Sequence, residues 1–225
     1  MANTRMRITR ELLHSCKGLR FSIVFLLLKL ALMKSIYTNA LLLFVAVINS
    51  AQAQNIPSAA QQIELALKAV PEAYRESATV LGYNPQGELI TLRKGSNTMV
   101  ALADDPQKDG FSVACYHKDL EPFMARGREL RAQGKDFRAI REIRGKEIKA
   151  GTLPMPDKST LYIYSGKYNA ATGKVADGYL RYVIYIPFAT SGNTGLPESP
   201  TSAGGPWIMD PGTHRAHIMV SPPKK

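Results

Sequence analysis

Apolar and polar residues change their spacing several times along the chain, which predicts a mixture of helices and strands. Between Ala60 and Lys68 apolar residues recur every three or four positions, as on one face of an amphipathic helix. Strand-like runs follow at 78–81 and 111–116. The segment 88–103 predicts a β-hairpin with Gly95-Ser96-Asn97 as its turn.

The middle of the chain predicts two helices. The first should run from Leu120 to Leu130, with Asp119 as its N-cap and Gly134 as its end, and the second from about Asp136 to Ala150. Both are dense in basic residues with acidic residues between them. The basic residues are Arg126, Arg128, Arg131, Lys135, Arg138, Arg141, Arg144, Lys146 and Lys149. One interpretation is a solvated helical face, and the other is a basic surface for an acidic partner.

Strands return at 161–165 and 179–188, and the second has apolar residues on both faces, which predicts a central strand covered on both sides. Residues 189–206 are rich in Gly, Ser, Thr and Pro and predict a long surface loop. Strands and helices do not alternate regularly. We therefore expect an α+β fold: a single domain with a mainly antiparallel sheet, an N-terminal helix and a central basic helix pair.

The N-terminal segment has the pattern of a secretory signal peptide. Met33-Lys34 is followed by the apolar run 40–48 and by Ser50-Ala51-Gln52-Ala53, where small residues precede a cleavage point. Met33 alone begins a complete signal peptide, so we take it as the true start, and cleavage is expected after Ala53. The alternative is an uncleaved anchor over residues 21–48. We expect residues 1–53 to be a leader, 54–225 to be one globular α+β domain, and no stable membrane insertion after cleavage.

Removing the leader changes the charge of the protein. Of the 29 Lys+Arg and 18 Asp+Glu residues, the leader holds seven basic and one acidic, so the remaining chain carries a net charge of +5 instead of +11. A mildly basic exported domain predicts an anionic envelope component as a partner and does not predict nucleic acid. The predicted location is the periplasm or the outside of a bacterium with a Gram-negative type of envelope.

Four residues are candidates for chemistry because they are the only histidines and the only cysteine after the leader: Cys115, His117, His214 and His217. Cys115 and His117 lie two apart on a predicted strand and should share a face. Cysteine and histidine are ligands of tetrahedral metal sites, so the four residues could hold a metal ion if the last strand pairs nearby. The alternative is a buried cysteine in the core beside histidines that only form hydrogen bonds.

Other polar residues extend this list. Asp119 and Asp210 are candidate carboxylate ligands or partners of ligands. Several strand tyrosines could line a ligand pocket or simply pack on the sheet. These are Tyr162, Tyr164, Tyr179, Tyr182 and Tyr185. The signatures of serine hydrolases, zinc proteases and dithiol redox proteins are absent from the sequence.

Several short stretches resemble a group of uncharacterised bacterial exported proteins. They are Ala78-Thr79-Val80, Leu92-Arg93-x-Gly95-Ser96-Asn97, Asp104-x-Pro106, Cys115-Tyr116, Pro206-Trp207-Ile208-Met209-x-Pro211-Gly212-Thr213 and Ala216-His217-Ile218-Met219. The resemblance implies export and a similar order of elements, and carries over no catalytic residues. It makes His217 the first polar residue to test.

The sequence therefore predicts an exported bacterial protein with two candidate functions. The first is a non-enzymatic envelope or extracellular binding protein. The alternative is a metal-assisted hydrolase that uses the Cys/His cluster.

Overall fold

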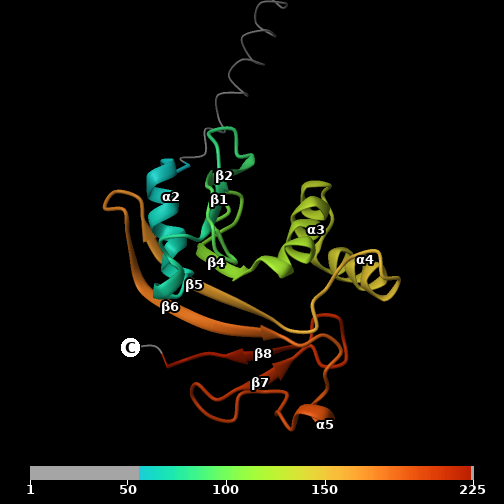
Figure 1. Cartoon of the computed structure of the whole chain (residues 1–225). Coiled ribbons are helices and arrows are strands. Elements are labelled where there is room, and N and C mark those ends of the chain that lie inside the picture. The colour runs from blue at the N-terminus through green and yellow to red at the C-terminus, as the bar shows by residue number, and fades with distance from the viewer. Residues whose placement is uncertain (1–55, 224–225) are drawn as a thin grey trace, which may run out of the picture. The chain divides into compact units, whose positions relative to one another are not determined.

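One eight-stranded sheet organises residues 56–223, the part of the chain that the computed structural model describes (Figure 1). With the labels of Figure 1, the strands are β1 (Thr79–Tyr83), β2 (Leu89–Arg93), β3 (Met99–Leu102), β4 (Phe111–His117), β5 (Ser159–Asn169), β6 (Lys174–Tyr185), β7 (Trp207–Met209) and β8 (His217–Val220). Their order is β2-β1-β3-β4-β5-β6-β8-β7. All neighbours are antiparallel except β1 and β3. The predicted leader and cleavage site lie outside the described residues.

The helices confirm the predicted N-terminal helix and central helix pair. They are α2 (Ala59–Ala66), α3 (Glu121–Ala132), α4 (Phe137–Lys149) and the short α5 (Ser191–Thr194), with 3₁₀ turns at Leu67–Ala69, Glu72–Tyr74 and Lys118–Leu120. Asp136 caps α4 as a hydrogen-bond acceptor for the Ala139 N–H at 2.8 Å. Within residues 56–223, no helix has both the length and the apolar character that crossing a membrane requires. The mixture of helices with a mainly antiparallel sheet confirms the α+β prediction.

The predicted N-cap of the first central helix is wrong. Asp119 lies inside the 3₁₀ turn that precedes α3, and its backbone N–H donates to Nδ1 of His117 at 3.4 Å. The helix itself begins at Glu121, with Leu120 as the capping residue. Pro122 near the first position explains this boundary, because proline fixes the helical φ and needs no hydrogen-bond donor there.

The predicted hairpin over 88–103 is also wrong. Strand β2 pairs with β1, and β3 lies on the other side of β1, parallel to it. The chain crosses the start of β1 at Gly95-Ser96-Asn97, where the N–H groups of Ser96 and Asn97 donate to the Ser77 carbonyl at 2.9 and 3.1 Å. The turn residues thus make a crossing segment instead of a hairpin turn.

Side chains of β4 alternate between two cores, one on each face of the sheet. Phe111, Val113 and Cys115 join the core that packs against α2. Tyr116 points to the opposite face and joins a core with Leu120 and Phe123 beside α3. The helix pair α3–α4 and helix α2 therefore belong to different faces of the sheet (Figure 1).

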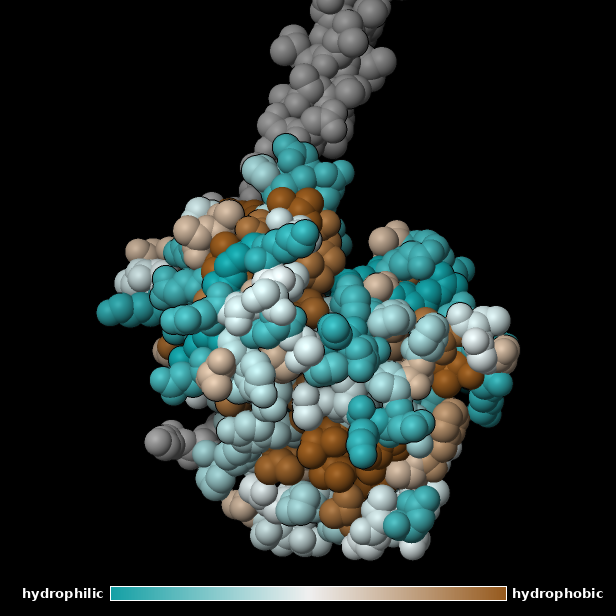
Figure 2. All heavy atoms as spheres, viewed as in Figure 1, coloured by the Kyte–Doolittle hydropathy of each residue, from teal (hydrophilic) through white to brown (hydrophobic). Residues whose placement is uncertain are grey.

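From residue 182 to its end, strand β6 is covered on one face only, contrary to the prediction. Val183 and Tyr185 are buried, whereas Tyr182 and Ile184 are 39% and 38% exposed. Helix α2 contacts β1 and β4 near the other end of the sheet and leaves these two side chains open. Figure 2 shows further apolar side chains gathered in the lower part of the view, where Figure 1 places β7 and β8.

Candidate functional site

The structure does not bring the four predicted metal ligands together. Cys115 belongs to the core beside α2, and His117, two residues further along β4, lies on the same face. His217 lies opposite Tyr185 on the other face, with 5.3 Å between the ring centroids. His214 is on that second face as well, packed edge-on against Phe123. Among the described residues, no group of three or more His, Cys, Asp or Glu could hold a metal ion.

Two of these residues, His117 and His217, have a polar partner nearby, whereas Cys115 and His214 are buried in the core. Burial raises the pKa of the Cys115 thiol to about 12, so the thiol stays protonated in the core. His117 lies 3.4 Å from the Asp119 carboxylate, and Nδ1 of His217 lies 2.6 Å from the carbonyl oxygen of Arg215. His214 is buried, and its Nε2 has no hydrogen-bond partner.

A different group of residues forms a cavity between the α3–α4 pair and the sheet, which we call the arginine cavity. Its volume is about 320 Å³, within the range of small-molecule sites. Apolar side chains from β3, β4, β5 and α3 line much of it. They include Leu102, Ala114, Leu161, Ile163, Phe123 and Met124. Its cationic residues are Lys108, Arg128, Arg131, Arg144 and Arg215.

Arg144 on α4 is the half-buried cation in this cavity that lacks a counter-ion among the described residues, and the exposed Arg131 has no ion pair either. Its guanidinium lies over the Phe123 ring, with Cζ 3.9 Å from the centroid, and Nη1 donates to the Phe123 carbonyl at 3.0 Å. Nε is buried without a hydrogen-bond partner, and none of the ion pairs between described residues includes Arg144. Burial and then the nearby Arg215 and Arg131 lower its pKa to about 10. Arg144 therefore remains charged at neutral pH.

Most of the other cations in the cavity have carboxylate partners. Arg128 pairs with Glu121 and donates to the Tyr116 hydroxyl at 3.2 Å. Lys108 lies 3.1 Å from Asp105. Arg215 Nη1 lies 3.6 Å from Asp210, whose other oxygen accepts from Arg141 at 2.9 Å. One carboxylate is thus shared between two arginines, so this end of the cavity has an excess of positive charge.

Asp104 lines the opposite part of the same cavity, on the loop between β3 and β4. Its Oδ1 accepts the Ser112 N–H at 2.8 Å, and no ion pair between described residues includes it. Burial and the neighbouring Asp105 raise the pKa of its carboxyl group, against the effect of the Ser112 hydrogen bond. Asp104 is therefore a half-buried acid that forms no ion pair with a described residue, although the charge of the nearby Lys108 acts to lower its pKa.

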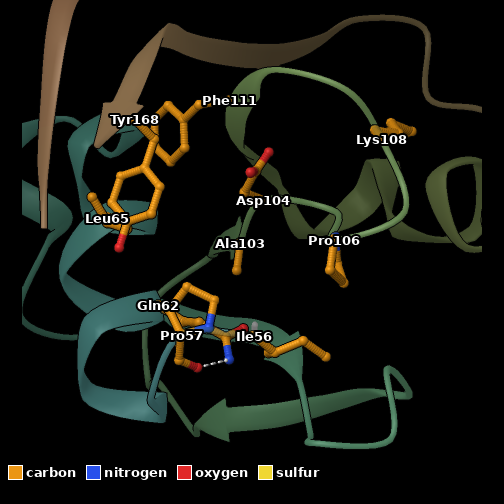
Figure 3. A pocket seen from close by; sticks show the side chains of 10 residues that line it. All are labelled: Ile56, Pro57, Gln62, Leu65, Ala103, Asp104, Pro106, Lys108, Phe111 and Tyr168. Atoms are coloured by element: carbon orange, nitrogen blue, oxygen red, sulfur yellow. Dashed lines mark hydrogen bonds between the residues drawn. The ribbon is translucent and has the colours of Figure 1, made fainter. Parts of the chain in front are cut away.

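Asp104 also borders a second cavity, which we call the side cavity (Figure 3). It has a volume of about 230 Å³ and mainly apolar walls. The walls include Ile56, Pro57, Leu65, Pro106, Phe111 and Tyr168. Gln62 also lines it, and its side-chain amide forms hydrogen bonds with the backbone of Pro57 and Tyr83, each 2.8 Å long. Asp104 and Lys108 line both cavities, so the loop that carries them forms a shared wall.

The arginine cavity was missed by the sequence analysis, although one signal for it was present. Arg144 lies four residues after Ile140 and four before Ile148, so it stands on the apolar stripe of α4 and not on the solvated face. An arginine in such a position is a candidate for a buried charge. Of the tyrosines proposed as pocket residues, Tyr185 lines the arginine cavity. Asp210, a candidate carboxylate ligand, pairs with Arg141 and Arg215.

No family model matches this chain, and no solved structure matches it significantly. Its function therefore has to be inferred from the geometry of the described residues.

Proposed function

We propose that this protein is an exported, non-enzymatic binding protein that captures a small organic anion in the arginine cavity. The observation that carries the proposal is the half-buried Arg144, which has no carboxylate partner among the described residues. A charge removed from water without a partner costs free energy, and a ligand carboxylate or phosphate would offset that cost with charge-assisted hydrogen bonds.

The lining of the cavity favours an anion with an apolar body. Leu161 and Ile163 from β5 and Ala114 from β4 offer apolar surface between the charged groups. Burying apolar parts of a ligand contributes roughly 25 cal/mol per Å². A purely inorganic ion would leave this surface unused.

The hydrolase alternative has no comparable support. It requires Cys115, His117, His214 and His217 to converge, and these residues lie in two pairs on opposite faces of the sheet. The cationic cavity fits the first hypothesis, a binding protein with an anionic partner.

Export is the second part of the proposal, and the leader of residues 1–53 supports it. The basic start, the apolar run and Ala51-x-Ala53 are the three parts of a cleavable signal. N-terminal sequencing of the protein recovered from the periplasm or the medium should give Gln54 as the first residue. Recovery of the intact chain from washed membranes would contradict export with cleavage.

Anion binding can be tested by calorimetric titration of the purified protein with benzoate and phenyl phosphate, with neutral benzamide as the control ligand. We expect an anion to bind and benzamide to bind far more weakly. Arg144→Gln should lower the anion affinity roughly tenfold or more, because a charge-assisted hydrogen bond contributes on the order of 2 kcal/mol.

Arg138→Gln is the matched control, since it removes the same charge from the same helix at a side chain that is 89% exposed and paired with Glu142. It should leave the affinity nearly unchanged. If neither anion binds, or if the two substitutions weaken binding equally, the cavity is not the anion site.

A further inference from the structure

The arginine cavity holds two half-buried charges of opposite sign, Arg144 and Asp104, and neither forms an ion pair with another described residue. They come from different elements: Arg144 from α4, and Asp104 from the loop after β3. They are also not each other's partner, because no ion pair within 4.0 Å joins them. A protein interior normally pairs such groups.

Apolar surface lines the cavity along with these two charges. Leu102, Ala114 and Ile163 belong to β3, β4 and β5, which are adjacent in the sheet. Beyond Asp104, the side cavity adds the rings of Phe111 and Tyr168, stacked with their centroids 5.7 Å apart (Figure 3). Aromatic rings attract a nearby organic cation.

We propose that the ligand is a small zwitterion with an apolar body, of the amino-acid or short-peptide class. Its carboxylate would accept hydrogen bonds from the Arg144 guanidinium, and its ammonium group would donate to the Asp104 carboxylate. This inference rests on the proposed function, since it uses the same cavity and the same arginine.

The remaining charges of the cavity support a zwitterion over a dianion. Asp105 and Asp109 line it together with Asp104, so the cavity has an acidic as well as a basic part. A second negative charge on the ligand, as in a phosphate monoester, would be repelled by these carboxylates. A ligand with one charge of each sign meets an opposite charge at both ends.

The test is a titration of the full protein at pH 6.5 with leucyl-leucine, its N-acetyl derivative and its C-terminal amide. The first ligand is a zwitterion, and each derivative lacks one of its two charges. Each derivative should bind roughly tenfold more weakly than leucyl-leucine. Free leucine, as a fourth ligand, separates an amino-acid site from a peptide site.

Two substitutions assign each charge of the ligand to its partner. In Asp104→Asn the acetylated and free dipeptides should bind equally, while the amide stays weaker than both. In Arg144→Gln the amide and the free acid should bind equally. Asn at 104 keeps an oxygen for the Ser112 N–H, so the variant retains that hydrogen bond. Asp157→Asn removes the same charge from an exposed position that lines neither cavity, and it should leave the order of affinities unchanged.

The outcomes separate this inference from the proposed function. If N-acetyl-leucyl-leucine binds as tightly as leucyl-leucine, the zwitterion inference is wrong and anion binding stands. If phenyl phosphate binds more tightly than the dipeptide, the ligand is an anion of another class. If neither the dipeptides nor benzoate bind, the proposed function itself is overturned.

Discussion

Gly127 on α3 provides the space that the guanidinium of Arg144 on α4 occupies. A Cβ atom at position 127 would lie 2.9 Å from Nη1 of Arg144 and 3.3 Å from its Cζ. Both distances are shorter than ordinary van der Waals contact. Glycine in a helix interior costs roughly 1 kcal/mol relative to alanine. The arginine that lies against position 127 explains why glycine occurs there despite this cost.

Gly127→Ala should therefore weaken ligand binding with little loss of stability. The added methyl group displaces only the end of a flexible side chain, and alanine favours the helix. We expect roughly tenfold weaker benzoate binding and a free energy of unfolding within about 1 kcal/mol of the wild type, measured by calorimetry and urea titration. Gly192→Ala is the control, since its nearest neighbour would be 3.8 Å away. Unchanged affinity in Gly127→Ala would argue against Arg144 as the anchor.

Arg144→Met distinguishes a binding residue from a structural one. Methionine keeps much of the apolar contact with Phe123 and removes a desolvated charge that has no carboxylate partner. Replacing such a charge by an apolar group is often neutral or stabilising. Urea unfolding without ligand should show no loss, or a gain of about 1 kcal/mol, while benzoate binding is lost. A loss of more than roughly 2 kcal/mol would mean that Arg144 mainly holds α4 in place.

The elements with a clear repeating pattern were predictable from the sequence, and the contacts between distant elements were not. The spacing of apolar residues and the Asp136 cap located α4 to within a residue or two. Strand β3 pairs with β1 and not with β2, and the connecting segment at Gly95 packs closely against the backbone at the start of β1. The local sequence pattern does not predict this contact. Register and strand order are tertiary properties.

The candidate site illustrates the same limit. Histidine is rare in this chain and chemically versatile, but residue type does not show which face of the sheet a side chain occupies. Arg144 was one of nine basic residues in the helix pair, and its position on the apolar stripe became meaningful only once α4 packed on α3. Asp104 lies in a loop between β3 and β4, where the sequence offered no periodicity to interpret.

His214 should make the folded protein sensitive to acid. Burial, followed by the cations of Arg144, Arg215 and Arg141, lowers its pKa from 6.5 to about 4, and Asp210 opposes this only in part. Between pH 6.5 and pH 4 the unfolded chain binds this proton and the folded chain does not, so stability falls as the pH is lowered through that range. The expected loss is on the order of 2 kcal/mol. Burial also lowers the pKa of His217, which acts in the same direction.

Urea unfolding at pH 7, 5.5 and 4 measures this dependence. His214→Gln should show a shallower loss of stability with acid than the wild type, whatever its stability at pH 7. His117→Gln is the comparison, because that side chain is 33% exposed and lies on the opposite face of the sheet. Equal pH slopes for the wild type and His214→Gln would rule out His214 as the source of the acid sensitivity.

Gly95→Ala should be strongly destabilising, because the crossing segment touches the backbone of the chain before β1. A Cβ at position 95 would lie 2.3 Å from both the Ser77 carbonyl oxygen and the Thr79 nitrogen, neither of which can rotate away. We expect a loss of roughly 3 kcal/mol in the free energy of unfolding.

Gly87→Ala is the matched control: residue 87 has φ +78° and a Cβ there would have no atom within 4 Å, so only backbone strain of about 1 kcal/mol applies. Hydrogen exchange of the Ala103 amide, which donates to Leu81 on β1 at 2.9 Å, should accelerate in Gly95→Ala and not in Gly87→Ala. Equal losses of stability in the two variants would contradict the close crossing and, with it, the parallel pairing of β1 and β3.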